Sequence, residues 1–416
     1  MNQEKKTSDL WKYVAIVLIA IVVALGAAMF TMVNSRLEEA ANKECSAETA
    51  VIETVAETEA EIPETEAATE TLSSRDKARA AGAEILSYWK DDSETKQKLI
   101  AFMEDITDES GSKYIPVEKR IAVFDFDGTL FCETDPNYFD YMLLVHRVLE
   151  DENYKDKASK FEKQTADKIV KQNETGESFK GLETDHGKSI ASSFKGMTID
   201  EFETYVHDFM RTPMLSYDGM TRGFGWYLPM LQIINYLEVN DFTVYIVSGT
   251  DRFIVRSIIN DENSPLAHMP MSHVIGSDES LVATGQDDED GLNYNYKTDD
   301  KVVTGGDFII KNLKMNKVTA IAKEIGEQPV LSFGNSTGDS SMAEYVISDN
   351  PYESLAFMLC CDDLQRENGN LEKAQKMYDL CAENGWVPVS MKNDWTTIYG
   401  DSVTKKNAAN EEKTAA

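Results

Sequence analysis

Two acidic residues stand one residue apart in the segment IAVFDFDGTL, residues 121–130, at the end of an apolar run. A carboxylate held in line beside a divalent cation can attack a phosphoryl group and form an acyl phosphate. We expect Asp125 to be this nucleophile. Asp127, on the same loop, is placed to protonate the leaving oxygen and then to take a proton from the attacking water. A bound cation would let the two like charges tolerate each other.

Donors for phosphoryl oxygens follow this acidic pair and a second apolar run. Gly128 lets the backbone turn sharply, and the Thr129 hydroxyl lies next to it. Ser248 and Gly249 end the apolar run at 242–247, where a hydroxyl and a backbone amide can hold a phosphoryl oxygen at the start of a helix. Ser248 is equally suited to be an ordinary helix N-cap, because serine is a favoured cap.

A lysine in or near the segment KMNKVTAIAKEIG could neutralise charge on both the nucleophile and the phosphoryl group. Lys317 is our candidate because it lies one predicted helix before the third apolar run. Lys311 and Lys314 compete with it, and spacing alone does not separate the three.

Oxygen ligands for a hard cation occur in the loop FGNSTGDSS, which follows the third apolar run. Asn335 and Asp339 offer an amide oxygen and a carboxylate, the donors that Mg²⁺ accepts in proteins. With the carboxylate of Asp125 and the backbone carbonyl of Asp127, they would complete an oxygen-rich magnesium site.

The elements that position these loops repeat the order strand, polar loop, helix. Short apolar runs at 121–126, 242–247 and 328–333 predict buried strands, and a weaker run follows His273. This order predicts an α/β fold, a three-layer core with a parallel sheet covered on both faces. The carboxyl ends of such strands form the edge at which ligands bind, so the polar loops should meet there.

Helical periodicity dominates two other parts of the chain. The segments 76–89 and 93–106 predict two amphipathic helices that lead into the core. Residues 131–240 contain three further helical patterns without a convincing strand, and this insertion is too long for a simple connection. We expect it to form a helical cap over the site.

The chain begins with features of a membrane protein. Residues 1–12 contain three lysines, and residues 13–33 form an uncharged apolar run long enough to cross a bilayer as a helix. The lysines predict a cytoplasmic N-terminal tail and a catalytic domain outside the cytoplasmic membrane. A cleaved signal peptide, followed by secretion, is the alternative. Residues 34–75 are rich in Glu, Thr and Ala and predict an acidic, disordered linker.

The composition excludes some functions. The formal net charge is −32, and phosphate backbones are bound by Lys and Arg clusters, so we expect no nucleic-acid partner. The five cysteines and five histidines lack metal-ligand spacing, which argues against a zinc site or a disulfide scaffold.

The FDFDGTL, VSGT, Lys317 and GNSTGD elements, in this order, resemble the four motifs of the haloacid dehalogenase (HAD) superfamily. The helical insertion after the first motif is similar to that of the phosphoserine phosphatase group. The resemblance implies a Rossmann-like core of residues 76–130 and 241–400, the cap, a polar tail at 401–416, and the roles given above. One departure is Asn335, because the family more often has Asp there.

The resemblance also suggests what is hydrolysed. Glu133 could attract an ammonium group, as the matching acid of phosphoserine phosphatases is thought to do, but it is equally consistent with a surface acid. Aromatic residues at 138–139 and 224–227 could line a pocket for a quaternary amine, although their spacing favours the core. We therefore expect a Mg²⁺-dependent phosphatase for small phosphomonoesters, such as phosphoserine- or phosphocholine-like compounds. There are two alternatives. One is an enzyme that transfers the phosphoryl group to an acceptor other than water, and the other is a ligand-binding surface protein whose catalytic activity Asn335 has weakened.

Overall fold

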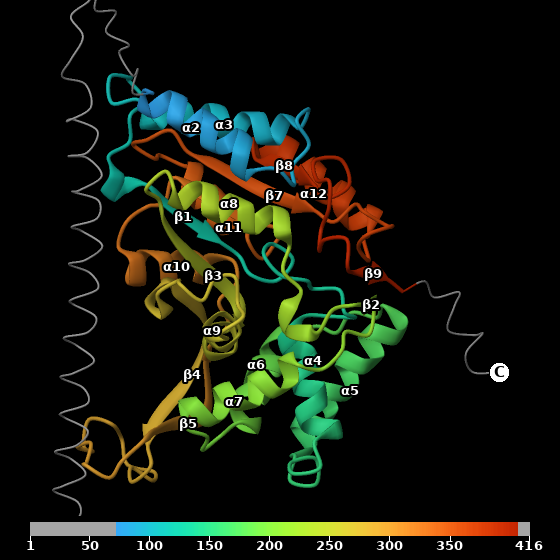
Figure 1. The fold of residues 1–416 in the computed structure, drawn as a ribbon. Coiled ribbons are helices and arrows are strands. Elements are labelled where there is room, and N and C mark those ends of the chain that lie inside the picture. Colours follow the sequence, from blue (N-terminus) through green and yellow to red (C-terminus); the bar gives the residue numbers. More distant parts are fainter. Residues whose placement is uncertain (1–71, 407–416) are drawn as a thin grey trace, which may run out of the picture. The chain divides into compact units, whose positions relative to one another are not determined.

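The computed structural model of the chain describes residues 72–406 (Figure 1). One sheet has the strand order β5-β4-β3-β1-β6-β7-β8 and is parallel except for the antiparallel pair β4 and β5. The predicted α/β fold with a mostly parallel sheet is confirmed. Its strands are β1 (Ile121–Phe124), β3 (Thr243–Asp251), β4 (Val274–Ala283), β5 (Val302–Ile310), β6 (Leu331–Gly334), β7 (Leu355–Cys360) and β8 (Val387–Ser390).

Helices cover both faces of this sheet. On one face lie α2 (Ser74–Ile85), α3 (Glu94–Thr107) and α8 (Leu228–Glu238), and on the other lie α10 (Met315–Ala320), α11 (Ser340–Ile347) and α12 (Leu371–Asn384). Successive side chains of β1 point to opposite faces of the sheet, so the strand contacts both helix layers. Phe124 packs in the hydrophobic cluster on one face, and Val123 packs with Met342 on the other. The helix α9 (Arg252–Asn260) packs against β3 and β4.

The two helices predicted at the start of the core are confirmed. Each begins at a serine cap, since Ser73 accepts a hydrogen bond from the backbone of Asp76 and Ser93 accepts one from Lys96. Strand β5 was not predicted. Gly305 and Gly306 interrupt its apolar pattern, and antiparallel pairing with β4 holds it in the sheet.

Four helices lie in the segment where the sequence predicts a cap (Figure 1). They are α4 (Phe139–Val145), α5 (Lys160–Thr175), α6 (Leu182–Ser193) and α7 (Ile199–Met210). Capping boxes at Ser159 and Thr198 start α5 and α7. Helix α6 was not predicted, because Gly187 and several polar residues weaken its apolar pattern.

Two boundaries taken from the sequence need correction. Helix α8 falls within the predicted cap at 131–240 but packs on α2 and β3, so it belongs to the core. Part of the predicted polar tail at 401–416 is structured, because β9 (Thr404–Lys405) pairs with β2 (Tyr217–Asp218). Both errors arise from packing between segments that are far apart in the sequence.

The predicted N-terminal tail (1–12), membrane segment (13–33) and most of the linker (34–75) lie outside the described residues. Among residues 72–406, no helix is both long and apolar enough to cross a membrane.

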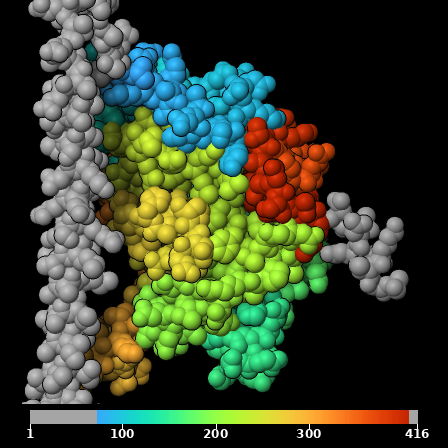
Figure 2. Space-filling view, viewed as in Figure 1, coloured from blue at the N-terminus to red at the C-terminus, as the bar shows by residue number. Residues whose placement is uncertain are grey.

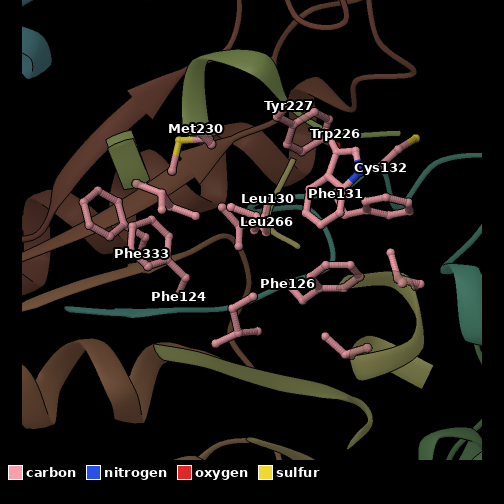
Figure 3. Packing of buried hydrophobic residues seen from close by; sticks show 14 of the residues in the cluster. Phe124, Phe126, Leu130, Phe131, Cys132, Trp226, Tyr227, Met230, Leu266 and Phe333 are labelled. Atoms are coloured by element: carbon pink, nitrogen blue, oxygen red, sulfur yellow. The ribbon is translucent and has the colours of Figure 1, made fainter. Parts of the chain in front are cut away.

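Aromatic side chains fill the core beneath the first acidic loop (Figure 3). Phe124 stacks on Phe333 with ring centroids 4.3 Å apart. Phe131 meets Trp226 edge to face at 5.1 Å, and Tyr227 beside it is fully buried. The core interpretation of this aromatic segment is thus confirmed for Trp226 and Tyr227, and these contacts fix the chain on either side of the cap.

A buried carboxylate joins the cap connections to the end of the core. Glu367 is completely buried and accepts hydrogen bonds from the hydroxyl groups of Thr134, Tyr217 and Tyr399. These three donors lie on segments far from Glu367 in the chain. Its charge-assisted hydrogen bonds therefore tie both cap connections to the loop after β7.

Replacing Glu367 with Ala should lower the free energy of unfolding by roughly 2–4 kcal/mol, because the buried Tyr217 hydroxyl and the half-buried hydroxyls of Thr134 and Tyr399 would lose their acceptor. Urea denaturation followed by circular dichroism measures this loss. Glu372→Gln is the matched control, since Glu372 makes a surface ion pair with Lys376 and should change stability by less than about 1 kcal/mol. Equal stability of the two variants would contradict the role given to Glu367.

Candidate active site

The loops after β1, β3 and β6 meet at the carboxyl edge of the sheet, because β1 lies between β3 and β6. A cavity of about 370 Å³ opens there, between these loops and the cap helices α4, α5 and α6. The core contributes Asp125, Asp127, Gly249, Asn335 and Asp339 to its lining. The structure thus brings together side chains from all three predicted loops.

Lys317 connects two of these loops. It is fully buried in α10, and its Nζ donates to Asp125 Oδ1 at 2.5 Å and to Asp339 Oδ1 at 2.7 Å. Burial lowers the pKa of Lys317, but the two carboxylates outweigh this effect and raise it above its usual value. Lys311 and Lys314, the competing candidates, line the cavity without a hydrogen bond to Asp125.

The Asp125 carboxyl group lies in a strongly perturbed environment. Burial and the nearby Asp339 raise its pKa to about 7, against the attraction of Lys317. Its backbone N–H donates to Phe333 O at 2.8 Å, which fixes the start of the loop against β6. Such a perturbed, fixed carboxyl group is typical of functional sites.

Asp127 has a partner that the sequence analysis missed. The Thr250 hydroxyl donates to Asp127 Oδ2 at 2.6 Å, while Asp127 Oδ1 is buried without a partner. Burial and the charge of Asp140 raise the pKa of Asp127 well above its usual value. Thr250 lies two residues beyond Ser248, and the VSGT motif was the only available signal for it.

The predicted phosphate donors are placed differently from one another. Gly249 lines the cavity, whereas Ser248 and Thr129 are fully buried and lie outside its lining. Ser248 Oγ accepts a hydrogen bond from Thr250 N at 3.0 Å, within an irregular part of β3. Ser248 is also not the N-cap of α9, because Asp251 has that place and accepts from Phe253 N at 2.8 Å. The Thr129 hydroxyl has no partner.

Asn335 and Glu133 meet over Gly128. The backbone of Gly128 has a φ of 74°, and a Cβ there would overlap Asn335 Nδ2 and the Glu133 carboxylate. Burial raises the pKa of Glu133 to about 7, although a hydrogen bond from Asn335 acts in the opposite direction. Glu133 is therefore a cavity residue next to the acidic loop, and the Asn335 amide lies beside its carboxyl group.

The oxygen donors at this edge suit a hard cation. Residues 72–406 contain no group of three or more His, Cys, Asp and Glu side chains arranged as metal ligands. Both oxygens of Asp339 are engaged, one by Lys317 and the other by the backbone N–H groups of Asn335 and Ser336. The donors left to a cation are the Asp125 carboxylate, the Asp127 carbonyl and the Asn335 amide oxygen. This mixed set fits Mg²⁺, which keeps part of its water shell.

No protein-family model matches the chain, and no curated protein matches its sequence. Among solved structures, a conserved protein of unknown function from Anaerococcus prevotii DSM 20548 is 14% identical, with a TM-score of 0.45, and the match covers 73% of this chain and 94% of that one. Cytosolic 5'-nucleotidase IIIB bound to cytidine is 11% identical (TM-score 0.43; coverage 73% and 87%). A HAD-family hydrolase from Salmonella enterica serovar Typhi is 13% identical (TM-score 0.33; coverage 62% and 65%).

These likenesses are loose, and the fold assignment comes from the chain itself. The four motif segments lie in the predicted order at one edge of a mostly parallel sheet, with helices inserted after the first. This is the arrangement that the resemblance to the HAD superfamily implies. Asn335 stands where that superfamily more often has aspartate, and its amide lies beside the Glu133 carboxylate.

The contact between Asn335 and Glu133 predicts a coupled effect of mutation. Asn335→Asp should lower the free energy of unfolding in EDTA by about 1–3 kcal/mol, because the amide beside the Glu133 carboxyl group would be replaced by a second carboxyl group. In the double variant E133Q/N335D, the amide and the carboxylate exchange places, so most of the loss should be recovered. Thermal denaturation of the four proteins measures this coupling. Additive effects of the two substitutions would show that the side chains do not interact.

Proposed function

We propose that this chain is a Mg²⁺-dependent phosphatase that hydrolyses small phosphomonoesters through an aspartyl-phosphate intermediate. The contact of Lys317 with both Asp125 and Asp339 carries this proposal. Lys317 is a fully buried cation, and its partner Asp125 lines the cavity. The positive charge of Lys317 supports attack by the Asp125 carboxylate on an anionic phosphoryl group. The leaving group belongs to a small alcohol, and phosphoserine- and phosphocholine-like compounds are both within the proposed class.

The chain's own residues divide the reaction into two steps. Asp125 attacks phosphorus while Lys317 holds its other oxygen in place and offsets the negative charge that gathers there. Asp127 gives a proton to the departing alcohol, and Thr250 keeps its carboxyl group oriented. Once the alcohol has left, Asp127 takes a proton from the water that cleaves the aspartyl phosphate. Gly249 lines the cavity, and in this proposal its backbone N–H donates to a phosphoryl oxygen.

In this proposal, Asp125, the Asp127 carbonyl and Asn335 hold Mg²⁺, and Asp339 supports the loop that carries Asn335. When bound, the ion supplies Lewis-acid neutralisation of the phosphoryl oxygens. We further propose that residues 13–33 anchor the chain in the cytoplasmic membrane, with the catalytic domain on the outer side. The apolar run and the lysines before it support this location.

Asp125→Asn should reduce phosphate release on the order of a thousandfold or more, because the amide is not a competent nucleophile. Release of inorganic phosphate from a panel of small phosphomonoesters, with and without Mg²⁺, measures this. Asp125→Glu retains the charge beside Lys317 but moves the carboxylate, and it should be similarly inactive. The surface variant Asp92→Asn is the control. Normal turnover by a folded Asp125 variant would rule out the proposed nucleophile.

Asp127→Asn should separate the two steps. With p-nitrophenyl phosphate, whose leaving group needs no protonation, the first step proceeds, but activation of water is lost. We expect a rapid burst of about one equivalent of nitrophenolate per enzyme, followed by slow turnover. Esters of ordinary alcohols should give no burst. Rapid-mixing absorbance measures the burst, and equal slowing of both phases without a burst would contradict the assigned role.

A further inference from the structure

The cap side of the cavity contains a carboxylate without a partner. Asp140, at the start of α4, lines the cavity, and its side chain is only 2% exposed. Neither of its carboxylate oxygens accepts a hydrogen bond. Burying a carboxylate in this way is costly unless a cation or several donors satisfy it. The reaction steps described above do not use Asp140.

Neighbouring groups do not satisfy this carboxylate. His186 lies with Nδ1 3.8 Å from Asp140 Oδ2, and its Nε2 faces the backbone oxygen of Asp140 at 3.1 Å. Because Nε2 must be the donor in that contact, Nδ1 of the neutral ring is an acceptor, and it also lacks a partner. Burial lowers the pKa of His186 to about 4, so the ring is neutral. Lys311 Nζ is 4.0 Å from Asp140 Oδ2, beyond hydrogen-bond distance.

Another acceptor lies on the next helix of the cap. Gln172 in α5 lines the cavity, and its Oε1 is buried without a donor. Two tyrosine rings, Tyr138 and Tyr141, also line this region and lie edge to face at 5.2 Å. This end of the cavity therefore presents two carboxylate oxygens and a side-chain carbonyl oxygen, with aromatic rings beside them.

These features select one kind of ligand group. A phosphate or carboxylate would be repelled by the unpaired Asp140 carboxylate and would leave both its oxygens and Gln172 Oε1 without a donor, although Lys311 lies 4.0 Å from Asp140. A quaternary amine carries the right charge but has no N–H to donate, so the acceptors would stay unsatisfied. A primary ammonium group provides three N–H donors and a positive charge, and it interacts favourably with aromatic rings.

We propose that the cap side of the cavity binds a primary ammonium group on the alcohol part of the phosphomonoester, with Asp140 as its anionic partner. This inference rests on the proposed phosphatase function and narrows its substrate class to aminoalcohol phosphates. Gln172 Oε1 is a second acceptor for the same group. The phosphoryl group lies on the core side of the cavity, beside Asp125.

The test compares three esters that share a phosphoryl group: O-phosphoethanolamine, phosphocholine and glycerol 3-phosphate. The full chain should hydrolyse O-phosphoethanolamine with the highest kcat/KM. Asp140→Asn should lower this kcat/KM at least about tenfold and change that for glycerol 3-phosphate by less than about threefold. Gln172→Leu is a milder change, and it should also lower the ratio of kcat/KM for O-phosphoethanolamine to kcat/KM for glycerol 3-phosphate. The control Asp185→Asn removes a cap carboxylate that pairs with Lys168 at 2.9 Å outside the cavity lining, and it should leave the ratio unchanged.

Several outcomes would overturn the inference while leaving the phosphatase intact. These are equal losses on all three esters in the Asp140 variant, or equal preference of the unmodified chain for ethanolamine and choline esters. If the unmodified chain hydrolyses no ester, the proposed function fails. Binding of O-phosphoethanolamine by calorimetry, before and after Asp140→Asn, then decides the inference separately, and unchanged affinity would refute it. The same measurement replaces kinetics if a variant folds without turnover.

Discussion

The site depends on one buried ion-pair cluster, in which Lys317 lies between Asp125 and Asp339. A fully buried ammonium group is unfavourable by itself, and the two carboxylates offset this cost only when both are correctly placed. The three residues come from the loop after β1, from α10 and from the start of α11. The cluster therefore requires three separate segments to adopt a single arrangement. Loss of Lys317 would leave two buried carboxylates without their cation, and loss of either carboxylate would leave Lys317 with one partner.

The parallel sheet makes this arrangement possible. Strand β1 lies between β3 and β6, so their carboxyl ends deliver the acidic pair, the VSGT segment and the Asn335 loop to the same edge. Hydrogen bonds then hold the first and the last of these loops in place. Asp125 N–H donates to Phe333 O, and Asp339 Oδ2 accepts from the backbone of Asn335 and Ser336. The Asp339 carboxylate thus positions the last loop and also neutralises Lys317.

The sequence predicts the local parts of this design and misses contacts that depend on distant pairing. Apolar runs ended by polar loops were enough to place β1, β3 and β6. Spacing could not select Lys317 over its two neighbours, because that choice depends on which side chain the short helix α10 turns toward Asp125. Thr250 was missed because β3 is irregular beyond Val247, and no local pattern reveals this. The β2–β9 pairing joins segments almost two hundred residues apart, and only the tertiary fold brings them together.

Charge balance links the two ends of the cavity. Six acidic side chains and two lysines line it, while Lys317 is buried behind the wall. A phosphomonoester adds further negative charge, so it can bind only where cations compensate. At the phosphoryl end, Lys317 and an oxygen-bound Mg²⁺ would provide this, and Glu133 engages the Asn335 amide there. At the cap end no positive group of the protein reaches Asp140 within hydrogen-bond distance among the described residues. A substrate that carries its own ammonium group resolves the remaining imbalance, since it places its negative charge against the core side of the cavity and its positive charge against the cap side.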